Sequence, residues 1–200
     1  MQKRTSFFIL LFLSSLILIS LFPGCLPVTP TVTVNAELLA IGDPYGGGKV
    51  AYIDGSGIHG LIAATADQST GIAWITGGST QTTWVNGTGY GGTSTDFGTG
   101  ATNTTAMMNQ TDYTGGAAKV CDDYSVTVDS VTYTDWFLPS KDELNKLYLN
   151  QVAIGGFAGS NYYWSSSENY ASYAWFQNFY YGGQYSSKDD GVRVRAVRAF

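Results

Sequence analysis

The chain has 200 residues, with ten basic and fifteen acidic side chains and a formal net charge of −5 at pH 7. This acidic balance excludes a nucleic-acid-binding role, because that role needs a basic surface. Glycine and aromatic residues are abundant and only 12% of the residues are charged, which excludes a disordered chain and indicates an exported, loop-rich, packed domain.

Residues 1–24 have the pattern of an export signal. Lys3 and Arg4 precede a short apolar run from Phe7 to Phe22, and Gly24-Cys25 resembles the end of a bacterial lipobox, although Phe22 and Pro23 are not the usual preceding residues. We predict lipidation of Cys25 and membrane attachment through the lipid anchor only. The alternative is ordinary cleavage and secretion.

Leu26, in place of aspartate after Cys25, favours sorting to the outer membrane, so we predict a location in the cell envelope. Residues 25–40 contain two prolines and alternating Val and Thr, which predicts an extended tether or, alternatively, a first edge strand. Residues 41–200 are long enough to form one domain.

The first half of this domain is predicted to hold a hairpin, a long loop and a helix. Val50–Ile53 and Leu61–Ala64 are apolar runs joined by the turn signal Asp54–Gly57. The composition of residues 77–112 predicts a long irregular loop, and we expect Trp84 and Phe97 to anchor it by packing against the rest of the domain. Residues 113–124 predict a helix in which Cys121 is a buried, unpaired thiol.

The second half is predicted to hold a capped helix and an antiparallel meander. Ser140 and Glu143 have the spacing of a capping box, and Leu144, Leu147 and Tyr148 follow at helical spacing. Strand-like segments cover Tyr162–Ser165, Tyr173–Phe179 and Val192–Ala199, with Gly182-Gly183 as a tight turn. The expected fold class is α+β with two helices.

The last forty residues combine two kinds of side chain. Bulky apolar residues suited to a core, among them Trp164, Trp175 and Phe179, alternate with a Tyr/Ser/Asn-rich set that is typical of recognition surfaces. If Trp175 points inward on its strand, Phe176 and Asn178 point outward. The predicted ligand-binding residues are Tyr170, Tyr173, Phe176, Asn178, Tyr180, Tyr181, Gln184, Tyr185, Ser187 and Asp189.

Arg193, Arg195 and Arg198 form the only basic cluster. Because Arg193 and Arg195 alternate with valines, the main interpretation is a final strand with one buried face and one solvated or salt-bridged face. A small anion site is the alternative.

Residues that would support catalysis or metal binding are sparse. His59 is the only histidine and lies in a turn segment, so no zinc or hydrolase site is predicted and no cofactor is expected. Helix capping and the helix dipole account for Asp142 and Glu143. The doublets Asp122-Asp123 and Asp189-Asp190 leave calcium binding open, although no lectin calcium motif is recognisable.

Several segments together resemble one known family: Asp135–Leu144, Gly155–Phe157, Tyr163–Glu168, Ala174-Trp175 and Val192–Phe200, with Ile41–Asp43, Gly47–Val50, His59–Ala63 and Asn103–Thr105 upstream. They are similar to the DUF1566 family, named for the C-terminal domain of the Legionella collagen-like adhesin. No collagen-like tract precedes the domain here.

The resemblance implies a C-type lectin-like fold, with Trp136 and Trp164 as core anchors, and a non-enzymatic role in binding a protein or a glycan. A structural envelope protein without a specific ligand is the alternative. Formylglycine-generating oxidases share this fold, but they need a cysteine pair that Cys25 and Cys121 do not supply. Some relatives in this fold are diversified by retroelements that mutate adenines. Codons of Asn, Tyr, Ser and Asp interconvert by changes at adenines, and these residues crowd the segment from Asn169 to Asp190, which makes retroelement diversification of this chain a further hypothesis.

Overall fold

The structure is a computed structural model that describes residues 38–76, 92–188 and 191–200. The predicted export signal, Cys25, nearly all of the tether, Trp84 and Asp189 lie outside these residues. The described elements are, in order, β1 (Pro44–Tyr45), β2 (Gly48–Ile53), β3 (Gly60–Ala63), β4 (Ser69–Ile72), β5 (Ile75–Thr76), α1 (Gly100–Met108), β6 (Gly115–Gly116), α2 (Ala117–Asp122), β7 (Val126–Val128), β8 (Val131–Tyr133), α3 (Lys141–Leu149), α4 (Gln151–Ile154), β9 (Tyr162–Tyr170), β10 (Tyr173–Asn178), β11 (Gln184–Ser187), β12 (Val192–Val194) and β13 (Val197–Ala199).

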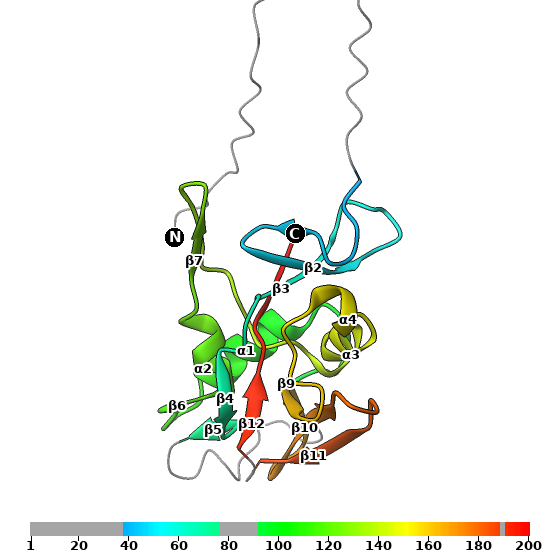
Figure 1. Cartoon of the computed structure of the whole chain (residues 1–200). Helices are drawn as coiled ribbons and strands as arrows, with labels where there is room; N and C mark the ends of the chain where they lie inside the picture. The colour runs from blue at the N-terminus through cyan, green and yellow to red at the C-terminus, as the bar shows by residue number, and fades with distance from the viewer. Residues whose placement is uncertain (1–37, 77–91, 189–190) are drawn as a thin grey trace, which may run out of the picture. The chain divides into compact units, whose positions relative to one another are not determined.

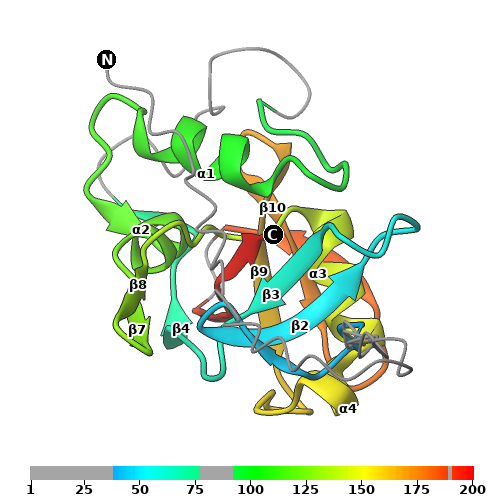
Figure 2. The same ribbon diagram turned by 90° about the horizontal axis from the view of Figure 1, so that it is seen from above.

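Two larger sheets organise these elements. One has the strand order β1-β2-β3-β13 and the other β11-β10-β9-β12-β4, while β5-β6 and β7-β8 form two-stranded sheets. Every pairing is antiparallel except that of β12 with β9. Strands β2 and β3 lie at the opposite end from β10 and β11 in Figure 1, and Figure 2 looks along that direction. The predicted α+β class with mostly antiparallel sheets is confirmed.

The early hairpin forms as predicted, with Val50 opposite Ile62 across β2 and β3. Its turn is closed by the Asp54 amide, which donates a hydrogen bond to the His59 carbonyl at 2.8 Å. His59 is exposed in this turn, as expected of a turn residue.

The described residues contain four helices, whereas two were predicted. Helix α1 falls within the range predicted to be loop, since its sequence GATNTTAMM lacks a strong apolar stripe. Tertiary hydrogen bonds hold it: the Leu138 amide donates to the Thr104 hydroxyl at 3.0 Å, and the Asn103 side-chain amide donates to the Ser94 carbonyl at 2.7 Å. Helix α2 is shorter than predicted and buries Cys121, whose unpaired thiol was expected.

The capping box at the start of α3 is confirmed. The Glu143 amide donates to the Ser140 hydroxyl at 3.3 Å, and the Ser140 amide donates to the Glu143 carboxylate at 2.7 Å. The same carboxylate accepts from the Gly98 amide at 3.0 Å, so Glu143 also ties the loop before α1 to α3. Burial raises the pKa of Glu143, and the hydrogen bonds from the backbone of Ser140, Gly98 and Gly100 oppose that shift.

This raised pKa predicts a specific pH dependence. The folded protein holds the Glu143 proton more tightly than the unfolded chain, so the stability from this group is complete below pH 4.5 and is lost as the pH rises through the folded pKa. We expect Glu143→Gln to remove this segment of the pH dependence. Urea denaturation at a series of pH values checks it, and an unchanged slope in the variant would contradict it.

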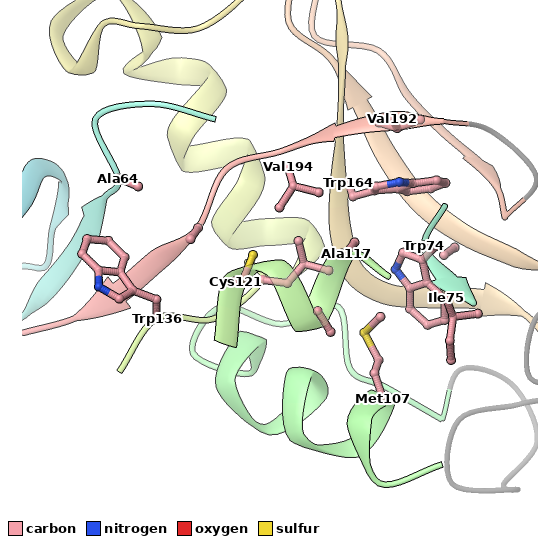
Figure 3. Packing of buried hydrophobic residues seen from close by; sticks show 14 of the residues in the cluster. Ala64, Trp74, Ile75, Met107, Ala117, Cys121, Trp136, Trp164, Val192 and Val194 are labelled. Atoms are coloured by element: carbon pink, nitrogen blue, oxygen red, sulfur yellow. The ribbon is translucent and has the colours of Figure 1, made fainter. Parts of the chain in front are cut away.

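Strand β9 divides two apolar cores because successive side chains point to opposite faces. Trp164 belongs to one cluster with Trp74, Trp136 and residues of α1 and α2 (Figure 3), whereas Tyr163 belongs to the other cluster with Phe179 and residues of α3 and α4. Hydrogen bonds fix two of these indoles: that of Trp74 donates to the Ser165 carbonyl and that of Trp164 to the Ile72 carbonyl, both at 2.7 Å. Trp136 and Trp164 are therefore core anchors, as predicted.

The segment predicted as one final strand is two strands in different sheets. Strand β12 lies between β9 and β4, β13 pairs with β3, and Arg195 and Ala196 separate the two strands. Arg195 is buried, stacks on the Phe157 ring and binds the Asp67 carboxylate at 2.6 Å; Arg193 binds the same carboxylate at 2.9 Å. The salt-bridged interpretation of this cluster is confirmed, and a protein carboxylate takes the place of the anion in the alternative.

Candidate ligand-binding surface

The β10–β11 hairpin and the neighbouring turn carry exposed tyrosines. The exposed fractions of the predicted tyrosines are 47% for Tyr170, 48% for Tyr173, 76% for Tyr180, 55% for Tyr181 and 45% for Tyr185. All five therefore reach solvent, as predicted.

A row of aromatic rings connects this surface to the core. Trp164 of β9 is opposite Phe176 of β10, which is opposite Tyr185 of β11, so the three side chains share one face of the sheet. Ring centroids are 5.4 Å apart for Trp164 and Phe176 and 6.1 Å apart for Phe176 and Tyr185. Trp164 is fully buried and Phe176 half-buried, so each exposed ring rests on a less exposed one.

Three phenols meet at the outer end of this row. The Tyr181 and Tyr185 hydroxyl oxygens are 3.1 Å apart, and the Tyr162 ring lies 6.4 Å from that of Tyr185. Hydrogen bonds to the Tyr185 and Tyr162 hydroxyls raise the pKa of Tyr181. The Tyr181 phenol therefore stays neutral at physiological pH, and its hydroxyl can both donate and accept a hydrogen bond.

The rings form the wall of an open groove of about 620 Å³. Its described lining residues carry no charged side chain, and they are Tyr162, Phe176, Tyr181, Tyr185, Ser186, Ser187, Gly191 and Val192. Pockets of this size with aromatic walls and a few polar groups are typical ligand sites.

Asn178 corrects one prediction about this surface. It was expected to face a ligand, but its side chain is only 5% exposed. Its carboxamide oxygen accepts from the amides of Tyr180 and Tyr181 at 2.8 and 3.2 Å. Asn178 therefore holds the turn that carries these tyrosines, a local role that Asn often has.

The turn also depends on Gly182, which has a φ of +80°. A Cβ at this position would lie 2.5 Å from the Tyr148 ring. We expect Gly182→Ala to destabilise the protein by at least about 1–2 kcal/mol, because the left-handed conformation alone costs that much for an L-residue.

Thermal unfolding measures this effect. Gly55→Ala is the matched control, because a Cβ there meets nothing within 4 Å, and its effect should stay within about 0.5 kcal/mol. Equal melting temperatures for the two variants would contradict the assigned turn geometry.

The predicted alternation on β10 is only partly correct. Phe176 lines the groove as expected. Trp175 was expected in the core but is half-exposed, and the Lys141 ammonium lies over its ring, 4.3 Å from the ring centre. Gln184 lies on the α3 side, where its side chain donates to the Lys141 carbonyl at 3.4 Å, and is thus separated from Tyr185. Bulges in the β9–β10 pairing shift the register, which strict alternation cannot anticipate.

The remaining predicted residues separate into two places. Ser187 lines the groove with Tyr185. Tyr170 and Tyr173 form their own ring pair, 6.4 Å apart, at the β9–β10 turn. Tyr162, Ser186 and Val192 line the groove but were not predicted as ligand residues; the signal was present for Tyr162, which belongs to the same run of tyrosines.

A buried ion pair next to the groove also escaped prediction. The Lys188 ammonium lies 2.5 Å from the Glu168 carboxylate, donates to the Ala171 carbonyl at 2.6 Å and sits 4.6 Å from the centre of the Trp74 ring. Burial lowers the pKa of Lys188, and the hydrogen bond to Glu168 opposes the shift. These contacts connect the residue after β11 to β9 and to the β9–β10 turn. Tyr185 on β11 and the Tyr170–Tyr173 pair are therefore carried by directly connected segments.

The described residues contain no group of three or more His, Cys, Asp or Glu side chains placed to hold a metal ion. Among the helices of this part of the chain, none combines the length and apolar character needed to cross a bilayer.

Comparison with known proteins gives one strong result. No curated protein matches the chain. Among solved structures, a fimbrial protein from Bacteroides ovatus ATCC 8483 is similar to 69% of the chain at 15% identity, with a TM-score of 0.40, and the chain spans 35% of that protein's length. The model of the Lcl C-terminal domain matches residues 63–198, well over half of the sequence. The chain therefore belongs to the family of the Lcl C-terminal domain.

Proposed function

We propose that this protein is an adhesin-like, surface-exposed ligand-binding domain that uses the groove between Tyr162, Tyr181 and Tyr185. Membership of the Lcl C-terminal domain family supports the adhesin-like role. The observation that carries the proposal is the aromatic row in which buried Trp164 supports progressively more exposed rings. Rigid exposed aromatics bind at low entropic cost.

The ligand of this proposal is a protein. The described lining residues of the groove are mainly tyrosine and serine without charged side chains, which is the usual composition of protein-binding surfaces. A glycan is the second candidate, because the family takes its name from an adhesin. Sulfated polysaccharides are disfavoured, since the chain is acidic and the described groove residues supply no Lys or Arg.

A binding screen with the mature chain tests this proposal. The immobilised protein is exposed to a glycan array and to purified extracellular proteins, and saturable binding to one class is expected. If no glycan and no extracellular protein binds saturably, the result would instead favour the structural envelope role without a specific ligand.

We place the protein in the cell envelope, anchored through lipid on Cys25. Lys3 and Arg4 before the apolar run, and Gly24-Cys25 at its end, support this proposal. Metabolic labelling with an alkyne fatty acid tests this: label on the wild type that is lost in Cys25→Ser supports the anchor, and equal or absent label favours secretion.

The finer fold assignment is also part of the proposal. The α+β arrangement with mostly antiparallel sheets is consistent with a C-type lectin-like domain, and a non-enzymatic role is proposed from membership of a family that is named for an adhesin domain. Calcium is not required in this scheme, and unchanged binding in the presence of a chelator is the expected result.

Retroelement diversification of residues 169–190 would explain the tyrosine-rich surface. The exposed Tyr170, Tyr173, Tyr180, Tyr181 and Tyr185 all fall within this range. The genomic test is a nearby reverse-transcriptase gene with a template repeat that differs from this region only at adenines. The lack of both would remove this part of the proposal and leave the binding role unchanged.

A further inference from the structure

A second cavity, of about 310 Å³, shares no lining residue with the tyrosine groove and lies where the β2–β3 turn, the loop before α1, the start of α3 and the end of β13 meet. Aromatic side chains dominate its wall: Tyr52, Phe97, Phe137 and Phe200. The rings of Tyr52 and Phe97 are 4.8 Å apart, and Phe97 remains 41% exposed at the rim. An aromatic hollow of this size suits a small ligand.

The charged side chains of the wall are acidic. Asp54 and Glu143 line the cavity, and His59 stands in the turn at its mouth. Hydrogen bonds from Ser56 hold the pKa of Asp54 below its ordinary value, so this carboxylate is ionised at neutral pH. Aromatic faces and carboxylates both attract cations, so the two kinds of lining residue select the same ligand charge.

The molecule already contains an example of this attraction. The Lys146 ammonium lies over the Tyr52 ring, 5.1 Å from its centre. The Tyr52 ring of the cavity wall thus already holds an alkylammonium group on one of its faces, and this lysine is not among the described lining residues of the cavity.

We propose that this cavity binds a compact organic ammonium group, held by the rings of Tyr52 and Phe97 and balanced by Asp54. The site is independent of the tyrosine groove and of the adhesin-like role. Its ligand is recognised by positive charge and apolar shape together, the combination that an aromatic and acidic pocket selects.

Choline and its neutral isostere 3,3-dimethylbutan-1-ol test the charge requirement directly. The isotope-labelled mature protein is titrated with each compound while the amide resonances are followed by NMR. Choline is expected to shift the amides of His59, Gly60 and Gly98 saturably and to bind about fivefold or more tightly than the alcohol. Equal affinities, no saturable shifts, or shifts confined to the β10–β11 hairpin would overturn the proposal.

Two variants are expected to act in opposite directions. Asp54→Asn keeps an oxygen for the Ser56 hydrogen bonds of the turn but removes the charge, so choline affinity falls about threefold or more. Lys146→Met removes a positive charge that lies next to the Tyr52 ring and repels a cationic ligand, so choline affinity rises. Asp122→Asn on α2 is the charge-matched control, because Asp122 is exposed and does not line the cavity, and it leaves affinity unchanged. An equal loss in Asp54→Asn and Asp122→Asn would show only a general effect of net charge and would overturn the site.

A further binding experiment with phosphatidylcholine vesicles distinguishes a soluble ammonium ligand from a lipid headgroup. Binding to free choline but not to phosphatidylcholine vesicles identifies a soluble ligand, and vesicle binding that Asp54→Asn weakens identifies a lipid headgroup. Vesicle binding that Asp54→Asn leaves unchanged, without binding of free choline, would contradict the cavity as the site.

Discussion

Replacing Asp67 with alanine is expected to lower the free energy of unfolding by about 3–5 kcal/mol, since removing one partner of a buried ion pair leaves the other charge uncompensated. The Asp67 carboxylate is 9% exposed and binds both Arg193 and Arg195. It also accepts from the Tyr163 hydroxyl at 3.1 Å. Arg195, fully buried, would keep only its bonds to backbone carbonyls, such as that of Ala64 at 3.0 Å.

Urea denaturation measures this loss, and Asp135→Ala is the matched control. Asp135 makes a comparable two-oxygen pair with Arg198, at 2.7 and 2.8 Å, but its side chain is 58% exposed. An exposed pair contributes little, so this control should cost less than about 1 kcal/mol. A small, equal loss of unfolding free energy in both variants would show that Asp67 and its partners Arg193 and Arg195 are solvated and do not hold the sheets together.

Truncating Tyr181 or Tyr185 to alanine is expected to weaken binding of the partner by about 2 kcal/mol or more, as for a central aromatic hot spot. Both rings are about half exposed and line the groove, so the melting temperature should stay close to that of the wild type. Tyr181→Phe keeps the ring and removes only the hydroxyl bonded to Tyr185, so its effect should be smaller. Surface plasmon resonance and thermal unfolding on the same samples provide both measurements.

Tyr45→Ala is the control for these variants. Tyr45 is 46% exposed and packs against Phe200, away from β10 and β11, so its truncation removes similar surface without touching the groove. Binding that survives in all three alanine variants would exclude the groove as the site. Unfolding of Tyr185→Ala would instead show that its ring belongs to the core.

The features that were predictable from sequence are those that local chemistry specifies. The Ser140–Glu143 capping box lies within four residues, and the β2–β3 hairpin combines two apolar runs with a turn signal. The exposure of the five tyrosines also followed from composition, because Tyr with Ser and Asn rarely forms a core.

The features that escaped prediction depend on contacts distant in sequence. Helix α1 is held by Thr104 and Asn103 through partners outside the helix, so its own sequence gives little helical signal. Lys188 looks like a solvated residue between Ser187 and Asp189, but its partner Glu168 is twenty residues away. Asn178 was assigned outward by alternation, whereas its side chain serves the adjacent turn. In each case the deciding partner lies on another element or in a backbone turn that periodicity does not describe.

The division of the final segment between β12 and β13 has a consequence for the order of folding. Residues 192–199 supply one strand to each of the two larger sheets, so neither sheet is complete until this segment has been synthesised. Both sheets therefore close late in folding, because the pairings of β12 and β13 join segments that are distant in sequence.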